Sequence, residues 1–264
     1  MLQSNETLGT PEAVEQQLRE TIRAATGRVM LALPAQHYPA LAPDLVDAVD
    51  DGVVVALLTY GGTPEAGPPV SEATTLYRSW EVTGGLTMLS TDRRDGFVAP
   101  NVVWEGTDGV NLVAYDEHPC LDYMTYSTFL AHVWDNGDER HVAAPPALPV
   151  EYDDLRNAVI TATLHLDDDR PVDATIEGRP ARTDEPFRDI AARVVATRQQ
   201  FVYPRTSPTY GVTQLVVRHE SGMGADSPTD GDAAATVDER LTVGGMESYI
   251  EDIEARAVRL RPAE

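Results

Sequence analysis

Hydrophobic residues recur every three or four positions from Val14 onward and predict a helix. Val14, Leu18 and Ile22 form a single apolar stripe at helical spacing. Thr10 suits the N-cap position and Pro11 suits the first turn, where its missing N–H is not needed. The chain therefore starts its first element at about residue 10, and we expect residues 1–10 to be disordered.

Two continuously apolar runs follow this helix. Residues 29–33 and 53–58 are rich in Val, Leu and Ala, which is typical of strands buried on both faces of a parallel sheet. The segment between them, 41–49, has the pattern of a helix. Helix, strand, helix and strand in this order predict an α/β unit. Further strands are expected at 87–90, 96–98 and 110–115, and a further helix at 123–133.

The pattern changes after residues 143–149, a proline-rich stretch that is the best linker candidate. Residues 152–166 look helical at first and strand-like later. Short β-rich pieces then alternate with turns and predict a small antiparallel sheet or partly open barrel. We expect strands at 172–177, 190–201, 210–219, 240–243 and 255–260, with a mobile loop at 221–235. The fold class is therefore α+β, with an α/β domain at 11–144 and a β-rich domain at 150–264.

Charge is the strongest signal in the composition. The 264 residues carry 43 acidic and 20 basic side chains, a net charge of -23, and every basic residue is arginine. The acids are dispersed along the chain, which favours a surface adapted to high salt, where repulsion is screened. Binding to DNA needs a basic face. We therefore expect no direct binding of nucleic acid by this chain.

Other global features point to a cytoplasmic protein. No apolar run approaches the roughly 18 residues of a membrane span. The N-terminus lacks the basic and apolar regions of a signal peptide. Cys120 is the only cysteine, so no internal disulfide can form, and a reducing compartment is the simplest setting.

Catalytic and metal-binding patterns are weak. The six histidines form no metal-binding motif, and without lysine there is no Schiff base or P-loop lysine. No Gly-x-Ser-x-Gly elbow is present, and acids around Cys120 disfavour its thiolate. We expect no catalysis, no metal and no cofactor. The alternatives are a hydrolase that uses groups near His37, Tyr60 or Asp92, and a protein-interaction domain.

The segment 241–251 combines residue types that suit a sugar site. A predicted strand runs into Gly244 and Gly245, where a ligand could approach the backbone closely. Met246 can adapt to an irregular pocket, and Tyr249 offers a flat face and a hydroxyl. Glu251 can accept two hydrogen bonds. A simple turn with two glycines is the alternative interpretation, and Glu254 is expected to lie on the surface.

This segment resembles a sugar-contacting segment of known regulators. The pattern Gly245-Met246-x-x-Tyr249-Ile250-Glu251 is similar to the Gly-Met-x-x-Val-Ile-Glu segment of TrmB-type archaeal sugar-responsive transcriptional regulators. Tyr249 replaces the valine of that pattern. Residues 13–61 resemble the phospholipase-D-like half of the family's effector region, and residues 128–141 resemble the segment that leads into its β-rich half.

The resemblance implies a non-catalytic effector module that senses a mono- or disaccharide. It implies ligand contacts by Gly245, Met246, Tyr249, Ile250 and Glu251, and a phospholipase-D-like scaffold. The family carries a winged helix-turn-helix before this region, whereas the likeness here begins at about residue 11. The expected partners are therefore the sugar and either a second copy of the chain or a DNA-binding partner protein, without contact to a membrane.

Overall fold

The computed structural model describes residues 2–3, 10–106, 110–207, 209, 212–219, 240–246 and 248–263. The chain divides into two compact units. The first, here called the α/β unit, comprises Met1–Ala143 with Gln200–Pro204; the second, the barrel unit, comprises Ala144–Gln199 with Arg205–Glu264. The expected mobile loop at 221–235 lies outside the described residues.

The α/β unit is built on an eight-stranded sheet in the order β1-β7-β6-β5-β2-β3-β4-β8. Strands β2, β3 and β4 are parallel, and the other pairings are antiparallel. The strands are β1 (Leu2–Gln3), β2 (Arg28–Pro34), β3 (Val54–Tyr60), β4 (Leu76–Trp80), β5 (Leu86–Thr91), β6 (Asp95–Pro100), β7 (Val113–Tyr115) and β8 (Asp138–Val142).

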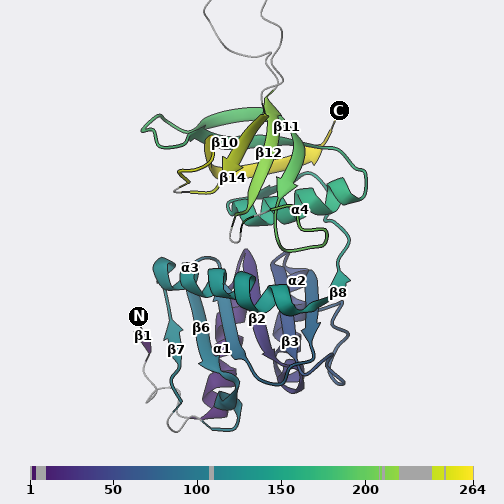
Figure 1. Ribbon diagram of the computed structural model, residues 1–264, viewed down its shortest axis with the longest axis vertical. Helices are drawn as coiled ribbons and strands as arrows, with labels where there is room; N and C mark the ends of the chain where they lie inside the picture. Colours follow the sequence, from purple (N-terminus) through teal and green to yellow (C-terminus); the bar gives the residue numbers. More distant parts are fainter. Residues whose placement is uncertain are drawn as a thin grey trace, which may run out of the picture. The chain divides into compact units, whose positions relative to one another are not determined.

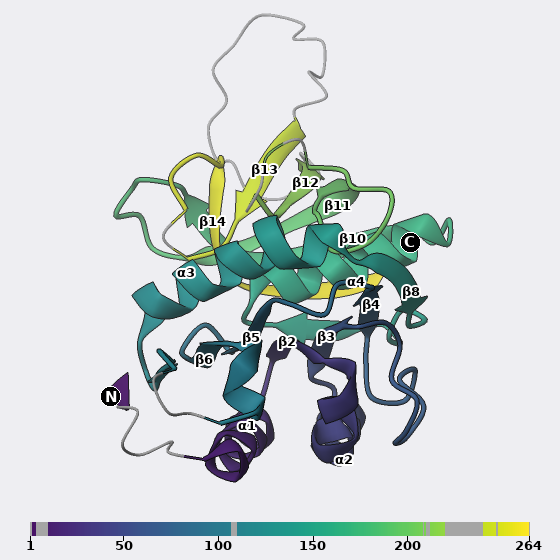
Figure 2. The same ribbon diagram turned by 60° about the horizontal axis from the view of Figure 1, so that its bottom comes forward.

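Helices cover both faces of this sheet. Helices α1 (Pro11–Ala24) and α2 (Tyr38–Asp50) lie together on one face, and α3 (Pro119–Thr128) lies on the other (Figures 1 and 2). Short helical turns follow at Ala35–His37, Asn101–Trp104, Phe129–Val133 and Trp134–Asn136. Coverage on both faces explains why β2 and β3 are almost wholly apolar. Of the helices within the described part of the chain, none combines the length and hydrophobicity that a membrane span requires.

The first helix follows the prediction from sequence. The Thr10 side chain accepts a hydrogen bond from Ala13 N at 3.2 Å, and Val14, Leu18 and Ile22 are fully buried. The expected disorder of residues 1–10 is wrong for Leu2–Gln3, which pair with β7. An unpaired sheet edge offers backbone groups to such a segment. Residues 1 and 4–9 lie outside the described residues.

One acid joins the two helices on the α1–α2 face. Asp44 in α2 is buried and accepts from Arg19 Nε at 2.7 Å and from Arg23 Nε at 2.6 Å, both in α1. A carboxylate that is taken out of water needs such partners. Asp44 is therefore an exception to the expectation that the dispersed acids lie on the surface.

The chain returns to the α/β unit at Gln200–Pro204, after it has entered the barrel unit. Arg78 of β4, which is fully buried, donates to the carbonyl oxygens of Trp134 (2.9 Å) and Phe201 (3.2 Å). Its guanidinium lies 4.8 Å from the ring centroid of Trp134 and 4.5 Å from that of Tyr203. Glu139 lies 3.6 Å from it. This returning segment, 200–204, is thus held by a buried cation.

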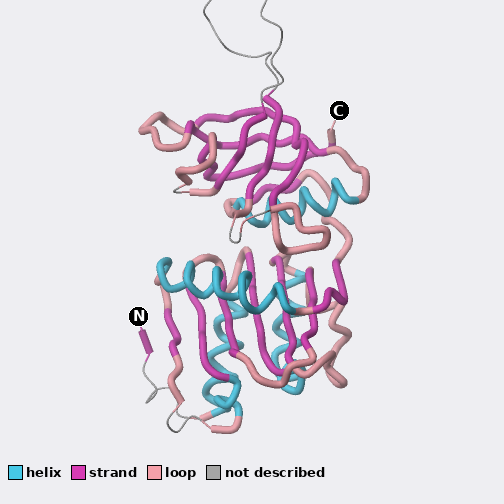
Figure 3. The backbone as a smooth tube through the Cα atoms, viewed as in Figure 1, coloured by secondary structure: helices cyan, strands magenta, loops and turns pink. Residues whose placement is uncertain are grey.

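The barrel unit closes five strands into a ring. The pairings run β10-β11-β12-β13-β14, and β10 also pairs with β14, while β9 adds to β14 (Figure 3). The strands are β9 (Val150–Tyr152), β10 (Val172–Pro180), β11 (Arg188–Arg198), β12 (Gln214–His219), β13 (Arg240–Gly244) and β14 (Ile253–Pro262), and the helix is α4 (Leu155–Asp167). The α+β class is confirmed. The ring is closed, and β13–β14 is a parallel pair.

Candidate functional site

The predicted segment follows β13 in the barrel unit. Gly244 ends this strand, and a side chain there would meet Ser248 and come within 2.7 Å of the Glu251 carboxyl carbon. The sequence suggested that glycine makes room for a ligand. Instead, the space beside Gly244 holds side chains of the segment itself. At Gly245 an added Cβ would make only ordinary contact, 3.7 Å from Leu155 Cβ.

Glu251 is the anchored member of the segment. Its side chain is buried, and Oε1 accepts a hydrogen bond from Gln214 Nε2 at 2.7 Å. The carbonyl oxygen of the Gln214 side chain accepts from Arg198 at 3.0 Å. Gln214 at the start of β12 therefore bridges an arginine and a carboxylate, which fixes the orientation of its amide. The sequence did not point to Gln214 or Arg198, because they lie far from residue 251 along the chain.

The other predicted site residues project outward from the barrel unit. Tyr249 and Ile250 are 69% and 67% exposed, and Met246 is also exposed. Where exposed apolar side chains form a contiguous patch, such a surface can bind a ligand or partner. The segment thus places an exposed tyrosine and isoleucine next to a buried, oriented carboxylate.

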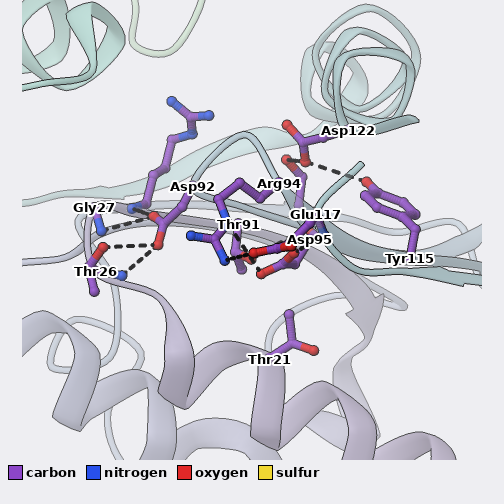
Figure 4. Close-up of polar contacts among 12 residues, drawn as sticks. Thr21, Thr26, Gly27, Thr91, Asp92, Arg94, Asp95, Tyr115, Glu117 and Asp122 are labelled. Carbon is purple, nitrogen blue, oxygen red and sulfur yellow. Dashed lines mark hydrogen bonds and ion pairs between the residues drawn. The ribbon is translucent and has the colours of Figure 1, made fainter. Parts of the chain in front are cut away.

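Asp92, one of the groups considered for catalysis, has a structural role (Figure 4). Its carboxylate accepts from the backbone N–H groups of Thr26 (2.6 Å), Gly27 (2.9 Å) and Arg28 (2.7 Å). These three donors lie where β2 begins. Because backbone donors occupy both oxygens, the side chain clamps the start of the strand.

The Asp92 clamp leads to a prediction about stability. Asp92→Ala should lower the free energy of unfolding of the α/β unit by about 1–3 kcal/mol, since three backbone donors lose a charged acceptor. Asp92→Asn, which keeps one acceptor oxygen, should lose less. Urea unfolding in molar KCl measures both. Equal stability of Asp92→Ala and the unchanged protein would show that water replaces the carboxylate without cost.

Further polar contacts in Figure 4 lie between the sheet and α3. Asp122 is buried and accepts from Ser90 Oγ at 2.6 Å and from the Tyr115 hydroxyl at 3.4 Å. Burial raises the pKa of Tyr115, so its phenol stays protonated and donates. In the part of the chain that the structure describes, no three His, Cys, Asp or Glu side chains are grouped to hold a metal ion.

The α/β unit contains a cavity of about 780 Å³ at the carboxyl ends of β2 and β3. His37 and Tyr60, the two other groups considered for catalysis, both line it. Burial raises the pKa of Tyr60 to about 12 and lowers that of His37. Tyr60 therefore remains a neutral phenol at neutral pH rather than a general base.

Trp104 also lines this cavity and was not identified from the sequence. Its ring stacks on His37 with centroids 4.1 Å apart and planes 12° from parallel. Its indole N–H donates to Thr87 Oγ1 at 2.7 Å, which holds the ring in place. The backbone of Gly85 packs directly against the Tyr60 ring, since a Cβ added at residue 85 would lie 2.6 Å from that ring.

Comparison with known proteins identifies relatives of the α/β unit. Residues 6–141 match the family described as transcriptional regulator TrmB, EBD N-terminal subdomain. Among curated proteins no sequence matches. The chain is similar in structure to TrmBL2, described as an archaeal chromatin protein with a novel mode of DNA binding. That match has 15% identity and a TM-score of 0.41, and it covers 53% of this chain and 52% of TrmBL2. The chain therefore spans about half the length of that protein.

Two further solved structures resemble it. One is Nuc, a phospholipase D family member from Salmonella typhimurium, at 14% identity and a TM-score of 0.38, covering 53% of this chain and 98% of Nuc. The other is NucT from Helicobacter pylori, at 9% identity and a TM-score of 0.37, covering 49% of this chain and 92% of NucT.

Proposed function

The chain belongs to the TrmB family of transcriptional regulators, through the N-terminal subdomain of the effector-binding domain, and on this basis we propose that it is a non-catalytic module that senses a sugar. Gly245, Met246, Tyr249, Ile250 and Glu251 are the proposed contacts. The observation that carries the proposal is the buried carboxylate of Glu251, oriented by Gln214, beside the exposed Tyr249.

Each group has a chemical task in this proposal. The ring of Tyr249 supplies a flat face for the C–H groups of a sugar ring, and Ile250 extends this apolar surface. The Glu251 carboxylate, already held on one oxygen by Gln214, accepts hydrogen bonds from ligand hydroxyls. Because Gln214 and Arg198 fix its position before binding, little ordering is required of this side chain when the ligand arrives.

Binding would act as a signal through a shift in populations. A ligand that binds one arrangement of the protein more tightly favours that arrangement by the difference in affinity. We propose that this shift controls a DNA-binding domain or partner protein, or a second copy of the chain. No step of this scheme requires bond making or breaking.

Isothermal titration tests the proposal. Purified protein in molar KCl is titrated with glucose, maltose, sucrose and trehalose, after circular dichroism has established that it is folded. We expect saturable heat with at least one of these sugars. Folded protein that gives no heat with any of them would contradict a sugar-sensing function.

The charge supports a second proposal, that the protein is adapted to high salt. At low ionic strength the net charge of -23 should destabilise the compact state by repulsion. At about 1 M salt the Debye length falls to about 3 Å, and this repulsion is screened. The melting temperature should therefore rise steeply from dilute buffer to molar KCl. A flat profile over that range would show that the acidic surface is not a salt adaptation.

A further inference from the structure

The cavity of the α/β unit lies where ligands commonly bind in α/β proteins. Pro34 and Tyr60, paired in register, end the parallel strands β2 and β3, and both line the cavity. Open α/β sheets bind their ligands outside the carboxyl ends of the strands. The volume of about 780 Å³ falls in the range of roughly 300–1,000 Å³ that is typical of small-molecule sites.

The charges around the cavity limit what it can bind. Among the residues that the structure describes, its lining includes no arginine, and the only acids in it, Glu65 and Glu105, are exposed at the rim. An anionic ligand would meet two carboxylates without a cationic partner, which is unfavourable. Since both acids are solvated, a cation would gain little from them in salt. The lining therefore favours an uncharged ligand over a phosphorylated or carboxylated one.

The wall of the cavity offers uncharged hydrogen-bonding groups next to aromatic rings. Gln36 Nε2 lies within hydrogen-bonding distance of His37 Nε2, at 3.1 Å, and burial lowers the pKa of His37. The buried Nδ2 of Asn101 has no hydrogen-bond partner among the described residues. Tyr60 adds a protonated phenol, and Trp104 supports the imidazole face.

We propose that this cavity is a second ligand site, for an uncharged, hydroxylated ring compound between a monosaccharide and a trisaccharide in size. Neutral donors and acceptors bind hydroxyl groups, and the stacked His37–Trp104 pair and the prolines supply the apolar faces that a ring needs. This inference rests on the proposed function only for the choice of sugars as probes. It involves none of the residues of the 245–251 segment.

Gly84 allows the cavity to be blocked without disturbing the fold. Gly84 lines the cavity, and a Cβ added there would meet no atom within 4 Å. Gly84→Trp should therefore fill the cavity, whereas Gly84→Ala should leave it open. Both variants and the unchanged protein are titrated with glucose, maltose, sucrose and maltotriose in molar KCl, and glucose 6-phosphate serves as the anionic comparison.

We expect Gly84→Trp to weaken binding of one sugar at least tenfold, or to remove one of two binding events, with Gly84→Ala unchanged. Glucose 6-phosphate should bind at least tenfold more weakly than glucose. If sugars bind equally well to Gly84→Trp, the cavity proposal is overturned while the sensing function stands. Equal binding of glucose 6-phosphate would overturn the ligand class, and no sugar binding by any protein would overturn both proposals.

A measurement on the unchanged protein keeps the test valid if Gly84→Trp does not fold. The imidazole NMR signals of His37, assigned by their loss in His37→Gln, should shift when the sugar is added. Signals of His165, in the barrel unit, serve as the internal comparison. Saturable sugar binding with unmoved His37 signals would overturn the cavity proposal.

Discussion

Replacing Arg78 with methionine is expected to lower the free energy of unfolding of the α/β unit by about 3–5 kcal/mol. Methionine keeps much of the length of the side chain but removes the charge and all donors. The carbonyl groups of Trp134 and Phe201 each lose their bond to Arg78, and Glu139 loses its cation. Hydrogen bonds from a charged donor contribute about 1.5–3 kcal/mol each, and two such bonds to buried carbonyl groups account for a cost of this size.

Tryptophan fluorescence during urea unfolding measures this effect selectively. The three tryptophans, Trp80, Trp104 and Trp134, all belong to the α/β unit, so their signal reports that unit alone. Arg94→Met is the matched control, because Arg94 is an exposed arginine of the same unit. A loss below about 1 kcal/mol for Arg78→Met, no larger than that of an ordinary surface change, would show that the buried cation does not secure segment 200–204.

Glu251→Gln is expected to weaken sugar binding about tenfold to a hundredfold. The substitution keeps the shape but removes the charge, and hydrogen bonds to charged groups contribute about 1.5–3 kcal/mol. The new amide oxygen can still accept from Gln214 Nε2, so the fold should be retained. Tyr249→Ala should also weaken binding, because it removes the exposed ring.

The control for this experiment is Glu185→Gln, which changes an exposed acid of the barrel unit. Glu254→Gln would be unsuitable. The sequence suggested a surface position, but Glu254 is buried and its Oε2 accepts from Arg179 Nε at 2.8 Å. If Glu251→Gln binds sugar as tightly as the unchanged protein does, the 245–251 segment is not the binding site.

The helices and strands that were predicted correctly are those whose sequence patterns lie within a few neighbouring residues. Helix α1 shows this, because its cap, its proline and its apolar stripe all fall within 13 residues of Thr10. The strands β2 and β3 were equally clear, since burial on both faces requires continuous apolar runs. The α+β class follows from the order of such elements.

Elements stabilised by distant partners were missed. Strand β4 carries Arg78 at its centre, a residue that does not suggest a core strand. Its burial depends on carbonyl groups from Trp134 and Phe201, which no local pattern reveals. Strand β8 consists largely of polar residues and lies at the sheet edge beside β4, where one side remains open to solvent.

Helix α4 shows how side-chain bonds can override propensity. The later part of residues 152–166 was expected to be strand-like, but the helix runs to Asp167. Thr163 Oγ1 donates to the Val159 carbonyl at 2.7 Å and lies 2.8 Å from Thr197 Oγ1, and Thr161 bonds to Tyr152 at 2.8 Å. Thr163 thus bonds to Val159 within the helix and to Thr197 in β11, and Thr161 bonds to Tyr152 in β9, so both hydroxyls have partners while the backbone stays helical.

The candidate site was predictable in its residue types but not in its geometry. The segment after β13 was chosen for its glycines, its tyrosine and its acid. The partner that orients Glu251, Gln214, lies 37 positions earlier in the chain. In the same way, His37 and Tyr60 stood out as isolated polar groups. Only the fold brings them together with Trp104 around one cavity.

The return of segment 200–204 bears on how such proteins can be recombined in evolution. A single crossover at Ala143 would separate Arg78 and Trp134 from the carbonyl group of Phe201 that both of them bind. It would also leave Phe201 and Val202, both buried here, without cover in the other fragment. A single crossover at Ala143 therefore cannot exchange one unit for another without loss of these contacts.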